Sequence, residues 1–185
     1  MDKPTLDGER VLLRPVTADD VPALLPAFAD PEVLRLTGSH DDGFDEARLR
    51  EWYGSRGDRP DRLDLAVVDK ATGRVIGEAV LNEWDPDNAS CSFRILFVPG
   101  TYGRGLGTEA TRLIVGHGFE RIGLHRISLE VYAFNPRARR AYEKAGFVAE
   151  GVLRDALRWE GEWVDATVMA VLAPDWFRHR GRPAA

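Results

Sequence analysis

The chain has 185 residues, and 44% of them are hydrophobic, so it can bury the core of one domain of mixed architecture without needing a second. Acidic and basic residues are interspersed and give a net charge of −5, which argues against a general nucleic-acid surface and favours a neutral or cationic substrate. No apolar run approaches the roughly 20 residues that a membrane span needs, and no secretion signal is visible, so we expect a cytoplasmic protein without a membrane partner.

The first third of the chain predicts one strand and three helical segments. Residues 9–15 are a candidate strand, and residues 17–20 resemble the capped start of a helix that continues through residue 28. Pro31 begins a short helical turn that ends near residue 36, because proline suits the first position of a helix. Residues 37–62 are polar and rich in Gly, Asp and Arg, and within them residues 46–53 have helical spacing.

The remaining two thirds predict six strands and two helices. The strands at residues 63–68, 74–84 and 90–98 are joined by turns so short that we expect antiparallel hairpins. Then come a helix at 108–121, a strand at 126–131, a helix at 136–144 and a hairpin at 148–159 and 163–172. Cys91, the single cysteine, falls in an alternating apolar strand, so we expect a buried thiol in a reducing compartment rather than a nucleophile.

Three glycines, Gly103, Gly105 and Gly107, lie where an apolar strand gives way to a helix. Glycine permits positive φ and close approach, and the first N–H groups of a helix have no intrahelical partner, so this loop is typical of a phosphate site. Alone, the loop fits a dinucleotide fingerprint, another anion nest or a plain flexible turn. A Rossmann domain needs repeated strand–helix–strand crossovers that begin with its glycine loop. Here an antiparallel meander comes first, which argues against nicotinamide binding.

A second dense segment covers residues 129–147. Asn135 is a good helix cap, Pro136 suits the first helical position, and Gly146 ends the helix. On that helix Tyr142 carries a phenol that can donate a proton.

Together the two segments resemble the GCN5-related N-acetyltransferases, or GNAT enzymes. Residues 9–15 with the acidic pair at 19–20, residues 105–110 and residues 145–154 bring the resemblance closest to the ribosomal-protein N-terminal acetyltransferases (RimJ/RimL-like). The resemblance implies an α/β fold of the α+β type: a single GNAT-like domain at residues 1–175. Its mixed, mostly antiparallel sheet of six to seven strands carries helices on both faces. Residues 176–185 are expected to form a basic, flexible tail.

The activity implied by the resemblance is direct transfer of an acetyl group from acetyl-CoA to an amine in a ternary complex. No Gly-x-Ser-x-Gly elbow is present, which agrees with the absence of an acyl-enzyme. The four histidines lack a zinc-like spacing with each other or with Cys91, so we expect no metal. A non-catalytic acetyl-CoA-binding sensor or scaffold and a transferase of longer acyl groups remain alternatives. A homodimer is possible, because the apolar strand at residues 167–172 is either a contact surface or internal.

The resemblance also implies a donor site. Asn135 matches a position that binds the pantetheine, although its role as a helix cap is a sufficient alternative. Tyr142 matches the usual general acid toward the thiolate, with an aromatic packed at the core edge as its alternative. Tyr102 departs from the family, which has Arg or Gln there, and Arg104 is expected to serve as a mobile counter-charge. The strand that aligns pantetheine and the loop that holds the pyrophosphate comprise Leu96, Phe97, Val98, Gly103, Arg104, Gly105, Leu106, Gly107 and Thr108.

The general base is not identified by the sequence. Relatives often carry a Glu on the strand before the glycine loop, but the polar positions here are Ser90, Ser92 and Arg94. The candidates are Glu78 and Glu83 on the preceding strand, with a solvated or ion-paired glutamate and a water relay as alternatives. The acceptor stays open among a protein N-terminal amine, an amino acid, a polyamine and the amine of an antibiotic.

Overall fold

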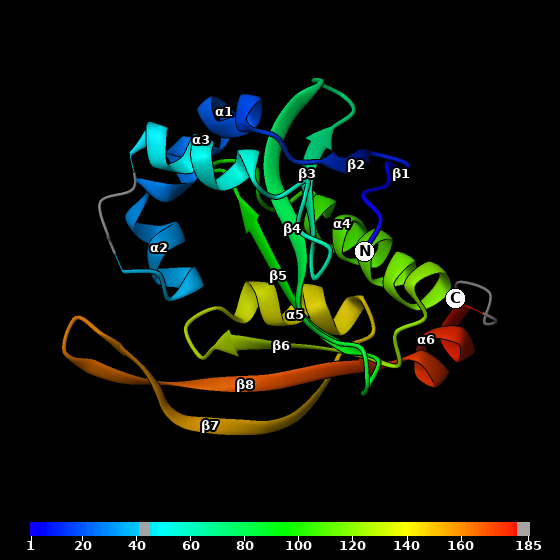
Figure 1. The fold of residues 1–185 in the computed structure, drawn as a ribbon. Helices are drawn as coiled ribbons and strands as arrows, with labels where there is room; N and C mark the ends of the chain where they lie inside the picture. Colours follow the sequence, from blue (N-terminus) through cyan, green and yellow to red (C-terminus); the bar gives the residue numbers. More distant parts are fainter. Residues whose placement is uncertain (41–44, 181–185) are drawn as a thin grey trace.

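One sheet organises the fold, and the computed structural model describes it over residues 1–40 and 45–180. In these residues the sheet has eight strands in the order β1-β2-β3-β4-β5-β6-β8-β7 (Figure 1). Neighbouring strands are antiparallel except β5 and β6, which are parallel. The strands are β1 Leu6–Asp7, β2 Val11–Pro15, β3 Leu63–Asp69, β4 Arg74–Asp85, β5 Ser90–Phe97, β6 Arg126–Tyr132, β7 Val148–Trp159 and β8 Glu162–Leu172.

The α+β fold is confirmed, but the predicted strand number of six to seven is wrong. The eighth strand is β1, which pairs with β2 over two residues, Leu6 with Leu13 and Asp7 with Leu12. A two-residue edge strand has no period that a sequence pattern can reveal. Strand β8 lies between β6 and β7, so the apolar residues 167–172 are inside the sheet. They offer no free strand edge to a second chain, and a homodimer stays a prediction.

The helices are set by capping residues as well as by apolar spacing. Asp30 accepts a hydrogen bond from the N–H of Val33, and Asp45 accepts one from that of Arg48, so α2 and α3 each begin with a capped turn. None of the described helices is both long and apolar enough to cross a membrane. The helical segments are the 3-10 turn η1 Ala18–Asp20, α1 Val21–Phe28, α2 Pro31–Thr37, α3 Glu46–Gly54, α4 Leu106–His117, the π-helical turn η2 Gly118–Ile122, α5 Pro136–Lys144 and α6 Ala173–Arg180.

Helix α6 was not predicted from the sequence, and residues 176–180 belong to it rather than to a flexible tail. The Trp176 ring packs against Phe119, with 5.9 Å between ring centroids, and its indole N–H donates to Glu120. This helix is therefore held by a contact with the end of the α4–η2 segment, more than 50 residues earlier in the chain. Residues 181–185, the rest of the expected tail, lie outside the described part of the chain.

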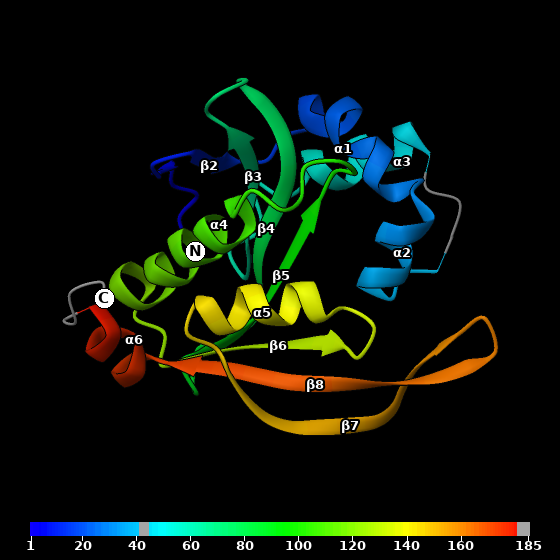
Figure 2. The same ribbon diagram turned by 180° about the vertical axis from the view of Figure 1, so that it is seen from behind.

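Helices cover both faces of the sheet. Helices α4 and α5 lie side by side on one face (Figure 2), where β3 and β4 present Leu65, Val67 and Ala79 to the main hydrophobic core. Helices α1 and α3 pack on the opposite face against Ala66 of β3. Side chains alternate between faces along a strand. Since Ala66 is directly opposite Glu78 in the β3–β4 ladder, Glu78 also lies on the α1–α3 face.

The sheet opens between its two central strands. β4 pairs with β5 as far as Phe97, whereas β6 pairs with β5 only from Ser90 to Ser92, so β5 and β6 diverge beyond that point. The N–H of Val98 donates to Ile76 of β4, and alternate N–H groups of a strand point to the same side. The N–H groups of Ile95 and Phe97 therefore point into the gap.

Gly77 shapes the same region of β5. A Cβ atom at this position would overlap the carbonyl oxygen of Leu96 in the paired strand. A glycine is thus required for the close approach of β4 and β5 at the gap.

Candidate active site

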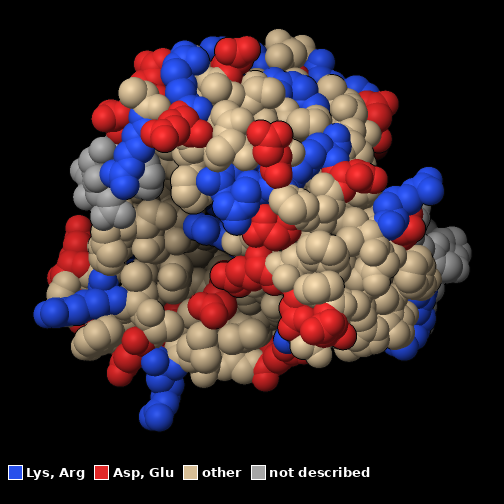
Figure 3. Space-filling view, in the orientation of Figure 1, with Lys and Arg blue, Asp and Glu red and all other residues tan. Residues whose placement is uncertain are grey.

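A cavity of about 700 Å³ runs through the gap between β5 and β6 and reaches both faces of the sheet. Figure 3 shows a hollow in the molecular surface with basic and acidic atoms around it. Most of the candidate residues from the sequence lie in the wall of this one cavity. They are Glu78, Glu83, Leu96, Phe97, Gly103, Gly105, Leu106, Gly107, Thr108, Asn135 and Tyr142.

Two of the candidate residues, Val98 and Arg104, do not line the cavity. Val98 uses its N–H to bond Ile76 of β4, and its side chain packs against the core under α1 and α3. The backbone of β5 is therefore free to bind a ligand at Ile95 and Phe97 rather than at Val98.

The glycine loop forms one end of the cavity. Gly103 and Gly105 have φ values of 83° and 76°, which favour glycine, and α4 begins at Leu106 rather than at the predicted Thr108. The first intrahelical bond is donated by Glu109 to Gly105, at 3.2 Å. No described group accepts the N–H groups of residues 103–108. These six donors, at the positive end of the helix dipole, have the arrangement that suits an anion, and their role stays a prediction.

Contacts behind the loop hold its shape. The backbone N–H and the guanidinium of Arg10 donate to the Glu109 carboxylate at 2.8 and 3.0 Å, and Arg10 also donates to the Arg104 carbonyl at 2.8 Å. Burial alone would raise the pKa of Glu109, but these bonds from Arg10 outweigh it and hold the pKa below its usual value. The one acidic side chain in the first turn of α4 therefore faces away from the anion site.

Arg104 is anchored rather than mobile. Its guanidinium donates to Asp69, a buried residue at the end of β3, at 2.8 Å. The hydrogen bond from Arg104 is the main cause that lowers the pKa of Asp69. A fixed negative charge holds a nearby guanidinium more firmly than solvent does, so the expected role of Arg104 as a counter-charge to phosphate does not fit this conformation.

Cations of α5 line the cavity instead, and the sequence reasoning missed them. Arg137, Arg140 and Lys144 are spaced by three and four residues, so they share one side of the helix. The Arg137 guanidinium lies 4.0 Å from the centroid of the Tyr102 ring, and the Tyr102 hydroxyl donates to the Phe97 carbonyl at 3.3 Å. The signal in the sequence was this basic spacing on the helix at residues 136–144, which follows β6.

Tyr142 presents a phenol without a hydrogen-bond partner. Its ring packs edge-on against Phe93 at 6.1 Å between centroids and against Phe147 at 6.0 Å, and the residue is only 9% exposed. No described group bonds to its hydroxyl. Burial raises the pKa of Tyr142 to about 12. The phenol is therefore protonated at neutral pH and free to donate to a ligand in the cavity.

Asn135 acts as the cap of α5. Its side-chain oxygen accepts the N–H of Ala138 at 3.1 Å, and its amide nitrogen donates to the carbonyl of Leu36 in α2 at 3.5 Å. Both ends of the amide thus have partners within the protein, so the structural role is satisfied and the pantetheine role stays a prediction.

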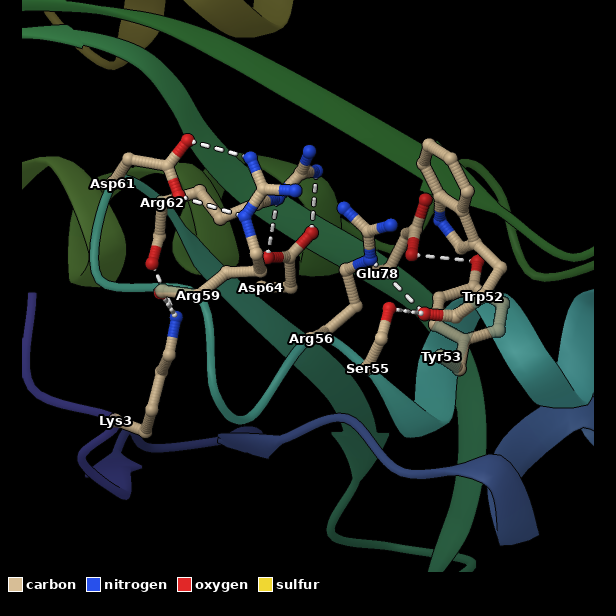
Figure 4. A network of polar contacts seen from close by, with 10 residues as sticks. All are labelled: Lys3, Trp52, Tyr53, Ser55, Arg56, Arg59, Asp61, Arg62, Asp64 and Glu78. Carbon is tan, nitrogen blue, oxygen red and sulfur yellow. Dashed lines mark hydrogen bonds and ion pairs between the residues drawn. The ribbon is translucent and has the colours of Figure 1, made fainter.

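Glu78 is the partly buried carboxylate of the cavity. It accepts a hydrogen bond from the Tyr53 hydroxyl of α3 at 2.7 Å, and Figure 4 shows this pair beside the ion pair of Arg62 with Asp64. Desolvation raises the pKa of Glu78, against the opposing effect of the Tyr53 bond. A carboxylate with a raised pKa is a better proton acceptor than a solvated glutamate.

Glu83 lies on the same side of the cavity because β4 is irregular there. Its φ is 53°, and the β4–β5 register shifts between Asn82 and Asp85. The exposed Glu83 carboxylate accepts a bond from the Ser92 hydroxyl at 2.6 Å. In this position it is a charged part of the rim rather than a buried base. Among the described residues no group of three potential ligand side chains is arranged to hold a metal ion.

The chain matches one known protein family. A family model described as an acetyltransferase (GNAT) domain matches residues 10–148, so the chain belongs to the GNAT family. It is therefore an N-acetyltransferase, and enzymes of this family use acetyl-CoA. The closer assignment to the RimJ/RimL-like subgroup stays a prediction.

Two sequence relatives and one solved structure agree with this class. A probable N-acetyltransferase, YjcK of Bacillus subtilis, is 28% identical over 178 residues, which cover 92% of this chain and 98% of YjcK. A spermidine N(1)-acetyltransferase of Vibrio cholerae is 32% identical over 106 residues, or 57% of this chain and 61% of the relative. The solved structure of a Vibrio cholerae spermidine N-acetyltransferase in complex with CoA and spermine superposes with a TM-score of 0.84 at 24% identity, covering 92% and 99% of the two chains. At that identity the superposition shows a shared fold.

Proposed function

We propose that this chain transfers an acetyl group from acetyl-CoA directly to an amine in a ternary complex, without an acyl-enzyme. One observation carries the proposal: the unpaired edge of β5, with the N–H groups of Ile95 and Phe97, shares a cavity with the free Tyr142 hydroxyl and the glycine loop. Backbone groups of an open strand edge align an extended ligand by strand-like hydrogen bonds.

The residues of the cavity fit the chemistry of the donor. Six free N–H groups at residues 103–108 suit a pyrophosphate, and the side chains of Arg137, Arg140 and Lys144 supply positive charge on the same side. A volume of about 700 Å³ is in the usual range for a site that encloses a small molecule. When bound, acetyl-CoA supplies a thioester carbonyl that a neutral amine attacks.

The chain's own residues then divide the work of transfer. Ile95 and Phe97 direct N–H groups at the gap, where one of them stabilises negative charge on a carbonyl oxygen. Glu78 accepts the proton that the amine loses as its new N–C bond forms. As the C–S bond breaks, the Tyr142 hydroxyl donates a hydrogen bond to the departing sulfur. No cysteine or serine nucleophile takes part: Cys91 is buried, and burial raises its pKa to about 12.

Release of free thiol from acetyl-CoA, measured across a panel of amines, tests this function. Because Cys91 is buried and protonated, it does not react with the thiol reagent and adds no background. We expect release that depends on both substrates, and an intact mass of the enzyme that is unchanged after incubation with acetyl-CoA alone. A mass increase of one acetyl group would contradict direct transfer. Stabilisation by acetyl-CoA without release for any amine would instead indicate a binding protein.

A further inference from the structure

Arg94 lies in the wall of the cavity and makes no hydrogen bond or ion pair with any described residue. It is directly opposite Val80 in the β4–β5 ladder, so its side chain projects from the same face as Glu78. This is the face that α1 and α3 cover, away from α4 and α5. The side chain is exposed, and no described residue accepts a hydrogen bond from it or forms an ion pair with it. Its charge acts at longer range on Glu78, where it lowers the pKa of that carboxyl.

Glu130 stands opposite Arg94 across the gap. The last paired residues of β5 and β6 are Ser92 and Ser128, so Arg94 and Glu130 come two residues further on, on the same face of two diverging strands. Glu130 is also exposed, lines the cavity, and forms no ion pair with any described residue. Because β5 and β6 diverge, Arg94 and Glu130 face the same cavity but do not form an ion pair with each other.

The charges on this face differ from those on the donor side. Glu78, Glu83 and Glu130 are acidic, but the first two already accept bonds from Tyr53 and Ser92. Arg94 is the single cation that the described strands contribute to the cavity, since Arg137, Arg140 and Lys144 belong to α5. A diamine would bring its second ammonium group near the Arg94 guanidinium, which repels it. A carboxylate matches the planar guanidinium and binds it through two parallel hydrogen bonds.

We infer that the acceptor is an amine that also carries a carboxylate, as a free amino acid does, and that Arg94 binds this carboxylate. The inference rests on the proposed function and names its substrate class. Glu130 attracts the ammonium form of the acceptor from the facing strand, and Arg94 selects against polyamines by repulsion. Arg94 is thus a specificity-determining residue.

Acceptor pairs that differ by one carboxylate test the inference. Phenylalanine, methionine, lysine and glutamate are each compared with the amine that lacks the α-carboxylate, by thiol release under saturating acetyl-CoA. We expect kcat/KM to favour the carboxylated member in at least one pair. In Arg94→Gln that member should lose about 10- to 100-fold in kcat/KM, the effect of one charge-assisted bond. The rates are compared at a pH above the acidic limb of both profiles, because the charge of Arg94 also lowers the pKa of Glu78, and there the decarboxylated partner should keep its rate.

Two variants and one competitor sharpen the result. Arg74→Gln makes the same change at an exposed position on β4 outside the cavity and should keep the wild-type preference. Arg94→Lys should retain part of the preference, and Arg94→Glu should shift it toward cadaverine. The α-hydroxy acid that corresponds to the preferred acceptor should compete with it in the wild type and much less in Arg94→Gln.

The other outcomes of the thiol-release assays contradict either the role of Arg94 or the proposed function. Equal rates within every pair, or a preference that survives Arg94→Gln, would overturn the role of Arg94. Release of thiol only with spermidine or with peptide amino termini would also overturn it and would leave the proposed function standing. Failure of every amine to release thiol would refute the proposed function itself.

Discussion

Replacing Tyr142 by phenylalanine tests whether the Tyr142 hydroxyl stabilises the departing sulfur. The phenol is buried, lines the cavity and has no hydrogen-bond partner among the described residues. Removing a buried and unbonded hydroxyl should not lower the thermal midpoint, since no hydrogen bond is lost. The substitution therefore separates chemistry from folding.

The size of the effect follows from two pKa values. Burial raises the pKa of Tyr142 to about 12, whereas an ordinary thiol has a pKa of about 8.5. Complete proton transfer from the phenol to a thiolate is thus uphill. We infer that Tyr142 stabilises the sulfur by donating a hydrogen bond and keeps its proton. Such a bond to a charged group contributes about 1.5–3 kcal/mol, which corresponds to a fall in kcat of about 10- to 150-fold.

Steady-state thiol release with acetyl-CoA varied gives kcat and KM for Tyr142→Phe, and the KM for acetyl-CoA should stay near the wild-type value. Tyr132→Phe is the matched control, because the ring of Tyr132 packs against Phe134 and its hydroxyl has no assigned role. An unchanged kcat would remove Tyr142 from the transfer step. A loss beyond about 1000-fold would refute the hydrogen-bond reasoning and restore full acid catalysis.

Three further substitutions probe the base, the loop and the sheet. If Glu78 is the base, activity is lost as pH falls through the pKa of Glu78. Tyr53→Phe removes a hydrogen bond that lowers this pKa, so the acidic limb of the kcat/KM profile should move to higher pH. Glu78→Gln removes the titrating group, so the acidic limb should disappear. An unaltered profile in both would indicate a water relay. Asp69→Asn removes the ion pair with Arg104 and should raise the KM for acetyl-CoA about fivefold with kcat little changed. An unchanged KM would show that the loop keeps its shape without this pair. Gly77→Ala should lower the free energy of unfolding, measured in urea, by about 2 kcal/mol or more, because the added methyl group overlaps the backbone of β5. Gly151→Ala places its methyl group in open space and should lower the free energy of unfolding far less. Equal losses would show that the sheet relaxes at Gly77.

Elements with local chemical boundaries were predictable from the sequence. The helix at residues 136–144 agrees with α5 at both ends, because Asn135, Pro136 and Gly146 mark those ends locally. The start of α4 was misplaced by two residues, since Gly105 already adopts a left-handed φ that allows Leu106 to begin the helix. Helix α6 was missed, because it depends on Trp176 meeting Phe119 in the folded chain.

The candidate site was predictable where it depends on backbone and not where it depends on side-chain direction. The glycine pattern indicates an anion site because the donors are peptide N–H groups whose direction follows from the turn. Arg104 and Asp69 are 35 residues apart, and no pattern in the sequence indicates that they pair. The same limit applies to Tyr53 and Glu78, which are 25 residues apart, so the hydrogen-bond partner of this candidate base could not be predicted before the fold was known.

The gap between β5 and β6 explains how one strand serves two substrates. Odd-numbered side chains of β5, such as Phe93 and Phe97, contact the α4–α5 side, and even-numbered ones, such as Arg94, contact the other. Between them the backbone of β5 is exposed only because β6 turns away after Ser92. A fully paired sheet would satisfy these N–H groups internally and would seal one face from the other. In the proposed function the missing ladder is what lets a donor beside α4 meet an acceptor on the opposite face. Arg94 and the glycine loop then lie on different sides of β5, so we expect a change in the charge of Arg94 to affect the acceptor rather than the KM for acetyl-CoA.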